Sequence, residues 1–454
     1  MQIAIIGTGY VGLTTGACLA AIGHEVTCLD NDPAKIEILR QGRVPIYEPF
    51  IEEILEEAKG RMRFTLSYEE AIPRAEVVFI AVGTPPSADG SPDLQYLRGA
   101  AAAIGEHLGS GFTVVVNKST VPIGSGNWVE SLIRESSAAR RGREAAEFAV
   151  ASNPEFLREG SALLDSLYPD RIVVGADAPR AVDVLSKLYR PILEQSFTPP
   201  GYLRRPDGVA AVPLVTTDLA SAELIKYAAN AFLALKISFI NEVGRLAEKV
   251  GADVTLVAKG IGLDRRIGTR FLQAGLGWGG SCFAKDTAAL VATAADYSLA
   301  MPIVSAARTV NQQQRERVVE KLLAELKIMK GKTVGLLGLA FKPNTDDLRD
   351  APSLDIARAL LARGATVVVH DPVAMERARA EHAGLGVRYC ETAEQVADHA
   401  DAVVLVTEWD EYQDLDWAAM AAKARTAFLL DGRHFLDVAR MTRDGWKCTR
   451  ISGC

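Results

Sequence analysis

The sequence predicts an α/β protein in which two doubly wound parallel sheets are joined by a long central helix. Short β-branched apolar runs alternate with helical stretches in the N-terminal half of the chain, and the same alternation returns from residue 332 onward. Between them, residues 218–250 form one predicted helix that is apolar on nearly every side. Alternating strands and helices are typical of parallel sheets, because a parallel connection requires a crossover.

The N-terminal sheet is predicted to carry polar loops at the carboxyl ends of its strands. Its predicted strands are Gln2–Ile6, Glu25–Leu29, 76–82, 113–118 and Phe148–Ser152. The last three run into loops with proline and polar residues, among them Thr84, Thr120 and Glu155. Ligands bind at this edge of an open α/β sheet, so the loops are predicted to line a site. Taken singly, each loop is better interpreted as an ordinary capped turn.

A glycine-rich motif, GTGYVG at residues 7–12, follows the first strand and opens a helix. This is the setting of the dinucleotide-binding fingerprint: Gly7 makes the tight turn, Gly9 admits the pyrophosphate and Gly12 lets the helix pack on the strand. The helix N-terminus, with Tyr10 and Val11, then faces the phosphates with its dipole and its unbonded N–H groups. We expect a Rossmann-like domain here, with a chance match or an FAD site as the alternative.

An acidic residue, Asp30, closes the second predicted strand. Its carboxylate is placed to accept hydrogen bonds from a ribose diol, and it would repel a 2′-phosphate. The sequence therefore predicts NAD rather than NADP as the cofactor.

The central helix carries a lysine and an asparagine among apolar residues. Lys226 and Asn230 are four residues apart and project from one face of the helix. A lysine in so apolar a helix is unfavourable unless it is paired or functional. The two are therefore candidates to stabilise a developing oxyanion. The alternative is a lysine stem that runs along the helix and carries its ammonium to water.

The stretch GLGWGGSCFAKD at residues 275–286 places one cysteine after a run of glycines. Glycines let backbone approach a ligand closely, and Lys285 would favour the nucleophilic thiolate of Cys282. Asp286 is a candidate to accept a proton or to orient a water. The alternative is a loop with a buried, inert cysteine.

A second α/β region is predicted from strands at 332–339, Thr366–His370, 402–407 and 427–430. Its first loop lacks a glycine-rich fingerprint but carries Lys342 and Arg349, and Arg433 follows the last strand. These cations are candidates to clamp phosphate; the alternative is ordinary solvated side chains.

Composition narrows the class of protein. The 454 residues are 48% hydrophobic and 24% charged, which suits a globular chain of two or three domains. The net charge of −7 argues against a general nucleic-acid or anionic-membrane binder. The six cysteines contain no C-x-x-C pair, so neither a disulfide framework nor a metal site is predicted. Without a signal peptide or a long apolar run, the chain is expected to be cytoplasmic with reduced thiols.

Together these features predict a stepwise oxidation. An alcohol would be oxidised to an aldehyde, which the Cys282 thiolate would capture as a thiohemiacetal. Loss of a second hydride would give a thioester, and water would hydrolyse it to a carboxylate. A cysteine is needed only if oxidation continues past the aldehyde.

Five motifs resemble the UDP-glucose/GDP-mannose dehydrogenase family and run in the family's order across nearly the whole chain. They are GTGYVG at 7–12, NPEFLREG at 153–160, AELIKYAANAF at 222–232, GGSCFAKD at 279–286 and FKPNTDDLR at 341–349. The resemblance implies NAD-dependent four-electron oxidation of UDP-glucose to UDP-glucuronate. Residues 165–175 resemble the UDP-glucose branch more than the GDP-mannose or N-acetylhexosamine branches.

The resemblance also implies a role for each matching residue. The implied catalytic residues are Cys282 as nucleophile, Lys226 and Asn230 for the sugar and its oxyanions, and Asp286, Thr120 and Glu155 for water and proton transfers. The implied cofactor contacts are Gly7, Gly9, Tyr10, Val11, Gly12, Asp30, Lys35, Thr84, Thr120, Glu159, Lys285 and Arg349. The implied substrate contacts are Glu155, Phe156, Leu157, Lys226, Asn230, Arg266, Phe271, Gly279, Lys342 and Arg433.

Three domains are predicted: residues 1–205 bind NAD, 216–325 form a central helical region with the cysteine stretch, and 328–454 bind the UDP-sugar. In relatives the counterpart of Arg266 reaches the substrate of a neighbouring subunit, so the resemblance implies a homodimer or higher homo-oligomer through the long helix. Residues 198–215 are longer than in many relatives and receive no functional interpretation.

Three alternatives remain at this point. One is a related four-electron dehydrogenase that acts on GDP-mannose or a UDP-N-acetylhexosamine. Another is a two-electron 3-hydroxyacid dehydrogenase, which needs neither the cysteine nor a second nucleotide-type domain. The third is a non-catalytic binder or sensor of nucleotide sugars that has kept the fold.

Overall fold

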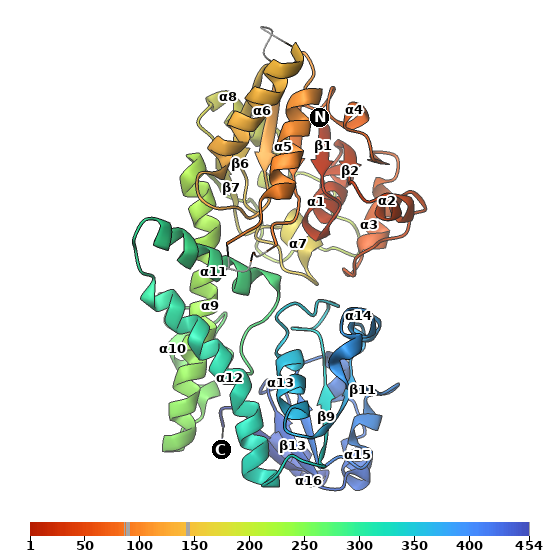
Figure 1. The fold of residues 1–454 in the computed structure, drawn as a ribbon, viewed down its shortest axis with the longest axis vertical. Coiled ribbons are helices and arrows are strands. Elements are labelled where there is room, and N and C mark those ends of the chain that lie inside the picture. The colour runs from red at the N-terminus through yellow and green to blue at the C-terminus, as the bar shows by residue number, and fades with distance from the viewer. Residues whose placement is uncertain (86, 88–90, 142–145, 454) are drawn as a thin grey trace. The chain divides into compact units, whose positions relative to one another are not determined.

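A computed structural model describes residues 1–85, 87, 91–141 and 146–453, and the chain divides into two compact units (Figure 1). The N-terminal unit comprises Met1–Ala228 and Ala288–Tyr297. The C-terminal unit comprises Ala229–Thr287 and Ser298–Cys454. Each unit is built on one sheet.

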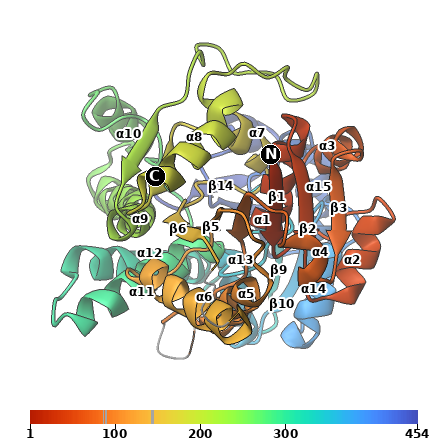
Figure 2. The same ribbon diagram turned by 90° about the horizontal axis from the view of Figure 1, so that it is seen from above.

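The N-terminal sheet has eight strands in the order β3-β2-β1-β4-β5-β6-β7-β8. The strands are β1 Gln2–Ile6, β2 Glu25–Leu29, β3 Met62–Thr65, β4 Val77–Ile80, β5 Thr113–Asn117, β6 Phe148–Ser152, β7 Ile172–Gly175 and β8 Leu214–Thr217. Strands β1 to β6 are parallel, which confirms the predicted doubly wound sheet, and Figure 2 shows β1, β2 and β3 next to one another.

One edge of this sheet departs from the parallel order, in strands that the sequence analysis does not predict. Strand β7 pairs with β6 in the antiparallel sense, where Ser152 lies opposite Gly175, and β8 is parallel to β7. Sequence periodicity reports which residues of a strand are buried but not the direction in which the strand runs, so this reversal leaves no trace in the apolar pattern.

Helices cover both faces of the N-terminal sheet. They are α1 Tyr10–Ala21, α2 Pro33–Arg40, α3 Ile51–Ala58, α4 Tyr68–Ala71, α5 Gln95–His107, α6 Ser125–Arg141, α7 Ala162–Leu167 and α8 Pro179–Leu193. Alternate residues of β1 enter two separate apolar clusters: Ile3 and Ile5 belong to one, Ala4 and Ile6 to the other. A strand buried on both sides explains why its sequence is continuously apolar.

The C-terminal unit contains a second sheet, of six parallel strands in the order β11-β10-β9-β12-β13-β14. The strands are β9 Thr333–Leu337, β10 Thr366–His370, β11 Arg388–Tyr389, β12 Ala402–Leu405, β13 Phe428–Asp431 and β14 Lys447–Arg450. The helices after β9 are α13 Pro352–Leu361, α14 Met375–Glu381, α15 Trp417–Lys423 and α16 Val438–Arg443, with short 3-10 helices at Ala383–Leu385, Glu394–Ala397 and Asp410–Gln413. This confirms the second predicted α/β region.

Four helices lie between the two sheets in sequence: α9 Leu219–Val250, α10 Val254–Gly262, α11 Ser281–Asp296 and α12 Pro302–Leu326. The long helix α9 has the predicted extent, and the Asp218 side chain accepts a hydrogen bond from the Ser221 N–H at its start (2.8 Å). The prediction that α9 is buried on nearly every side is wrong for one stripe along the helix. Apolar side chains at seven-residue spacing along this stripe are 50–63% exposed: Phe232, Phe239 and Leu246.

Over the described ranges, none of the helices has the length and apolarity that a membrane crossing requires. Among the same residues, no group of three or more His, Cys, Asp or Glu side chains is arranged to hold a metal ion.

Candidate active site

The glycine-rich turn between β1 and α1 has the geometry that its sequence predicts. Gly7 has φ +99°, and a Cβ there would lie 2.5 Å from the Ala81 carbonyl oxygen. A Cβ at Gly12 would lie 1.9 Å from the Gly7 oxygen, so α1 packs against the turn only because position 12 lacks a side chain. Gly9 differs, since a Cβ there would meet no atom within 4 Å. As the N-cap of α1, Gly9 also offers no side-chain hydrogen bond to the first turn, where Tyr10 and Val11 lie.

Asp30 follows β2 directly and is almost fully buried beside this turn. One carboxylate oxygen accepts from the Thr8 N–H (2.7 Å) and hydroxyl (2.8 Å), and the other accepts from the Asp32 N–H (3.1 Å). Burial works against the charge, but the hydrogen bonds from Thr8 and Asp32, together with the positive charge of Lys35 on α2, hold the pKa of Asp30 below its usual value. Asp30 is therefore a fixed anion.

Two predicted site loops are bonded to each other at the carboxyl edge of the sheet. The Thr84 hydroxyl donates to the Thr120 carbonyl oxygen (2.9 Å), and the Ser119 hydroxyl donates to the Val82 carbonyl oxygen (2.8 Å). The loop after β4 and the loop after β5 thus share one edge, as parallel strands require.

The loop at residues 153–160, which follows β6, brings Glu155 to Lys226 of α9. The Lys226 Nζ donates to the Glu155 Oε1 and to its carbonyl oxygen, both at 2.7 Å, and the two side chains are only 5% and 7% exposed. Burial opposes ionisation of Glu155, but Lys226 and the Leu157 N–H hold its pKa below the usual range. Lys226 is thus a paired, buried lysine, and its stem does not carry the ammonium to water.

The same loop carries three further candidates. Two cations lie over the Phe156 ring, with the Arg171 guanidinium 3.6 Å and the Lys226 ammonium 5.5 Å from its centroid. Leu157 and Glu159 are half-buried. The loop is not helical, so the helical repulsion between Glu155 and Glu159 that four-residue spacing would produce does not arise.

Sequence reasoning missed a second buried lysine in this cluster. Lys118 follows β5, and its Nζ donates to the Asn153 Oδ1 (3.1 Å). Burial lowers its pKa to about 8, while Glu155 acts to raise it and Lys226 to lower it. A signal was present: Lys118 directly extends a run of buried strand residues, where lysine is rare unless it is paired.

The C-terminal unit holds Cys282, and its local structure corrects the prediction of a loop cysteine. The glycine run ends at Gly280, and Cys282 is the second residue of α11. At a helix N-terminus the dipole favours the thiolate. Cys282 and Asp286 are four residues apart in one helix, so they share a face. The sequence signal for this start was Ser281, a favoured residue at helix N-termini.

Asp286 is 1% exposed and is held from two sides. The Asn230 Nδ2 of α9 donates to its Oδ2 (2.6 Å), and the Lys285 Nζ lies 3.5 Å from its Oδ1. The Arg308 guanidinium of α12 donates to the Ala284 carbonyl oxygen (2.8 Å), which fixes the first turn of α11. The structure therefore brings the predicted residues Cys282, Lys285, Asp286 and Asn230 into one local group.

The glycines before Cys282 are needed for close packing. A Cβ at Gly279 would lie 2.5 Å from the Asp350 oxygen, and one at Gly280 would lie 2.8 Å from the Phe341 ring. Phe271 packs edge-on to Phe283, with ring centroids 6.3 Å apart.

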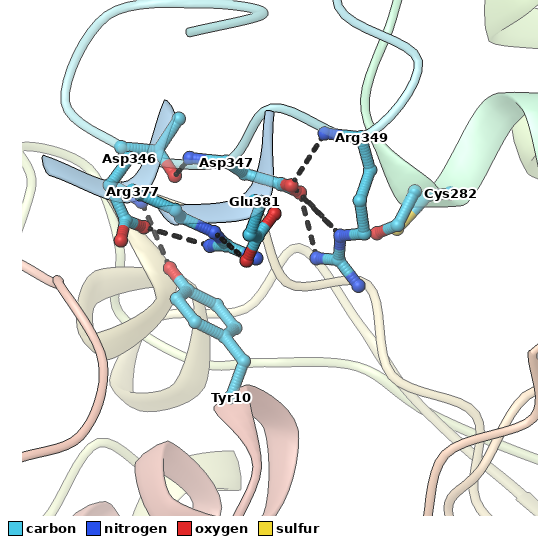
Figure 3. A network of polar contacts seen from close by, with 10 residues as sticks. Tyr10, Cys282, Asp346, Asp347, Arg349, Arg377 and Glu381 are labelled. Carbon is cyan, nitrogen blue, oxygen red and sulfur yellow. Dashed lines mark hydrogen bonds and ion pairs between the residues drawn. The ribbon is translucent and has the colours of Figure 1, made fainter. Parts of the chain in front are cut away.

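Two of the predicted cations of the C-terminal unit, Arg349 and Arg433, face carboxylates. Arg349 makes a fork to Asp347, with its Nε 2.8 Å from Oδ1 and its terminal nitrogen 2.7 Å from Oδ2, as Figure 3 shows. Arg433 donates to the Val406 carbonyl oxygen (2.7 Å) and lies 3.2 Å from Glu408. Lys342 is half-buried and lies 5.6 Å from the Phe341 ring centroid.

Arg266 makes its side-chain contacts within its own loop. Its side chain is 88% exposed and pairs with Asp264 at 2.6 Å in the segment after α10. Among the contacts of the described residues, the Arg266 guanidinium donates hydrogen bonds only to Asp264, which lies in the same loop.

Comparison with known proteins places the whole chain in one family. Models of the UDP-glucose/GDP-mannose dehydrogenase family match at residues 1–193 (NAD binding domain), 220–313 (central domain) and 335–438 (UDP binding domain). A UDP-glucose 6-dehydrogenase of Rhizobium meliloti (strain 1021) is 44% identical over 99% of both chains. One from Bacillus subtilis (strain 168) is 42% identical over 98% of this chain and 92% of its own length.

The solved structures agree with these sequence matches. A UDP-glucose dehydrogenase from Pyrobaculum islandicum superposes with a TM-score of 0.88 at 42% identity, over 100% of this chain and 98% of that one. The chain therefore belongs to the UDP-glucose/GDP-mannose dehydrogenase family, and its N-terminal region is the NAD-binding domain of that family.

Proposed function

We propose that this protein is an NAD-dependent dehydrogenase that oxidises UDP-glucose to UDP-glucuronate, removing four electrons. The observation that carries the proposal is the position of Cys282 at the start of α11, on the same helical face as the buried Asp286. A nucleophilic thiol is required only when an aldehyde is oxidised further. Relatives that are 42–44% identical over nearly the full chain bear the name UDP-glucose 6-dehydrogenase, which supports the choice of sugar.

The N-terminal unit fits NAD. Gly9 leaves open space beside the N-terminus of α1, where a pyrophosphate would bind, and the fixed anion Asp30 would hold a ribose diol. We assign the remaining contacts to the residues that match the family: Gly7, Tyr10, Val11, Gly12, Lys35, Thr84, Thr120, Glu159, Lys285 and Arg349. When bound, NAD accepts one hydride in each of two oxidations.

In the first oxidation the C6 hydroxyl loses its proton and C6 loses a hydride, which leaves an aldehyde. Asp286 and Glu155, with Thr120, are assigned to proton transfer and to positioning water. Both carboxylates are buried and bonded, Asp286 to Asn230 and Glu155 to Lys226, so their geometry is fixed before substrate arrives.

In the second oxidation the Cys282 thiolate attacks the aldehyde carbon, and a C–S bond forms. The resulting oxyanion is stabilised by Lys226 and Asn230, whose nitrogen atoms carry N–H donors. Loss of a hydride from this thiohemiacetal gives a thioester. Water then attacks the thioester, the C–S bond breaks, and the products are the carboxylate, the thiol and one proton taken up by a carboxylate base.

The uridine nucleotide and sugar are assigned to the residues that match the family's substrate contacts. These are Glu155, Phe156, Leu157, Lys226, Asn230, Arg266, Phe271, Gly279, Lys342 and Arg433. The UDP binding domain of the family matches residues 335–438, which supports a UDP-sugar. The identity to a UDP-D-ManNAc dehydrogenase from Pyrococcus horikoshii is 26%, against 42% to the Pyrobaculum enzyme, so the N-acetylhexosamine alternative is less well supported.

We also propose a homodimer, with α9 and α10 in the interface. Phe232, Phe239 and Leu246 recur every seven residues along α9 and form one exposed apolar stripe, and Leu256 and Leu263 add exposed leucines on and just after α10. Exposed apolar patches of this kind mark interaction surfaces. In such a dimer, the exposed Arg266 would serve the substrate of the partner subunit, as the family resemblance implies. The division into domains at 1–205, 216–325 and 328–454 is part of the same proposal.

The dimer is tested by sedimentation. The unaltered protein should sediment as a dimer or larger, whereas Phe239→Glu should shift it toward monomer at the same concentration, because a charge cannot be buried unpaired in an apolar interface. Tyr96→Glu on α5 is the matched control, since Tyr96 is similarly exposed at 48% but lies outside the stripe. A monomeric unaltered protein, or a dimer that Phe239→Glu leaves intact, would contradict this interface.

A cytoplasmic location is proposed because the scheme requires Cys282 as a reactive thiolate, and that compartment keeps thiols reduced. The net charge of −7 does not favour nucleic acid as a partner.

A further inference from the structure

A buried lysine outside the residues given roles so far adjoins the Lys226–Glu155 pair. Lys118 is 9% exposed and stands at the carboxyl end of β5, the edge of the sheet at which the loops of the proposed site lie. Its Nζ donates to the Asn153 Oδ1 and lies 5.9 Å from the centroid of the Phe79 ring. A buried ammonium in such a setting needs either a neutralising partner or a function.

The acceptor of Lys118 is itself fixed. Asn153 Oδ1 also accepts from the Tyr189 hydroxyl of α8 (2.6 Å), and Asn153 Nδ2 donates to the Val173 carbonyl oxygen of β7 (2.7 Å). Asn153 is the first residue of the loop at 153–160 and stands two residues before Glu155. Lys118 therefore holds the base of the loop whose carboxylate is assigned to proton transfer.

Charge links Lys118 to Glu155 as well. The charge of Glu155 raises the pKa of Lys118, and the charge of Lys226 lowers it. In turn, the positive charges of Lys226 and Lys118 both lower the pKa of Glu155. Arg171 lies over the ring of Phe156, next to Glu155, and the Tyr189 hydroxyl is kept neutral because burial raises its pKa. The cluster thus has two lysines for one carboxylate, one more cation than the ion pair needs. Such an excess favours an ionised Glu155 and an anion formed beside it.

We propose that Lys118 is a positioning residue that keeps Glu155 ionised and aligned for proton transfer. This rests on the proposed function, in which Glu155 handles a proton. Lys118 forms no bond to the substrate in this scheme; it acts through Glu155 and through Asn153.

The test compares the pH dependence of kcat/KM for UDP-glucose in the full-length protein and four variants. Lys118→Met and Lys118→Gln remove the charge, and Gln also keeps a donor for Asn153 if the Met variant fails to fold. Lys118→Arg restores the charge. Tyr189→Phe is the matched control, because it removes another hydrogen bond to the same Asn153 oxygen without changing any charge.

The acid limb of the profile should move up by about one pH unit in the Met and Gln variants, because loss of a nearby cation raises the pKa of Glu155. It should return toward its original position in Lys118→Arg and should not move in Tyr189→Phe, even if that variant melts at a lower temperature. An unmoved limb in folded Lys118→Gln, or an equal shift in Tyr189→Phe, would overturn the electrostatic role.

A second readout separates this inference from the assigned activity. Infrared titration of the Glu155 carboxylate, identified by its loss in Glu155→Gln, needs no turnover. A raised Glu155 pKa in Lys118→Gln supports the inference whichever sugar the protein oxidises, and an unchanged value overturns it. If the unaltered protein forms no NADH from UDP-glucose, the proposed function is wrong, whatever the Lys118 variants show.

Discussion

The thiol of Cys282 stands at the second position of α11, four residues before a buried carboxylate that Asn230 holds at 2.6 Å. The helix N-terminus favours the thiolate, and the fixed carboxylate on the same face offers a proton acceptor. Chemistry at the residue scale therefore depends on one helix and on the side chain of α9 that packs against it.

Replacement of Cys282 tests this arrangement. Cys282→Ser should lower the rate of UDP-glucuronate formation by roughly a thousandfold or more, because a serine hydroxyl is far less ionised and less nucleophilic than a thiol. NAD binding, followed by protein fluorescence, should be unchanged. Cys448→Ser is the control, since Cys448 is also half-buried but belongs to β14. Normal turnover by Cys282→Ser would rule out the thioester scheme.

Choice of dinucleotide should depend on Asp30. Because hydrogen bonds from Thr8 and Asp32 hold this carboxylate as a fixed anion, NADP should be used with a kcat/KM roughly a hundredfold or more below that of NAD. Asp30→Ser should narrow the ratio, mainly through KM for NADP. Equal use of both dinucleotides by the unaltered protein would remove the role given to Asp30.

For single residues, the sequence predicts roles that a local motif fixes better than roles that depend on a partner distant in the chain. The sequence predicts Gly7, Gly12 and Asp30 because the turn after β1 and the end of β2 require these residue types at a fixed spacing along the chain. It does not predict Lys118, because its partner Asn153 lies 35 residues away and becomes a neighbour only when β5 and β6 pair.

Helix α9 ties several parts of the N-terminal unit to one element. Glu223, three residues before Lys226, accepts from the N–H groups of Gly124 (2.7 Å) and Gly126 (2.8 Å) at the start of α6. This carboxylate caps a helix that belongs to a different stretch of chain, so it anchors the loop that carries Thr120.

The free energy of unfolding should fall as rising pH ionises Glu223. Burial raises its pKa from 4.5 to about 7, so the stabilisation that this group gives is full below pH 4.5 and is lost as pH rises through about 7. Between pH 6 and pH 9 the loss should amount to about 1 kcal/mol in the free energy of unfolding. Chemical denaturation of the unaltered protein and of Glu223→Gln measures it, and the variant should show the smaller change over that range. Equal slopes in the two proteins would contradict this assignment.

The elements themselves were largely predictable, with two instructive exceptions. The glycines before Cys282 dominate the local pattern and predict a loop, yet Ser281 begins α11. The apolar sequence of α9 predicts burial on nearly every side, but Phe232, Phe239 and Leu246 are exposed. Apolar periodicity shows that a face is meant to be covered and does not say by which chain.

For the whole molecule, two sheets with β-α alternation follow from the sequence, and matches to all three family domains agree with them. The reversal at β7 does not follow, because strand direction is not encoded in burial. The sugar is likewise not fixed by the fold alone, since relatives with other nucleotide-sugar substrates share it.

The most direct test of the account is the number of NADH molecules formed per molecule of UDP-glucose, with limiting sugar and excess NAD. The account predicts a ratio near 2, because oxidation runs from the alcohol through the Cys282 thioester to the acid. A ratio near 1 would mean that the aldehyde leaves the enzyme, and the covalent role of Cys282 would then be wrong.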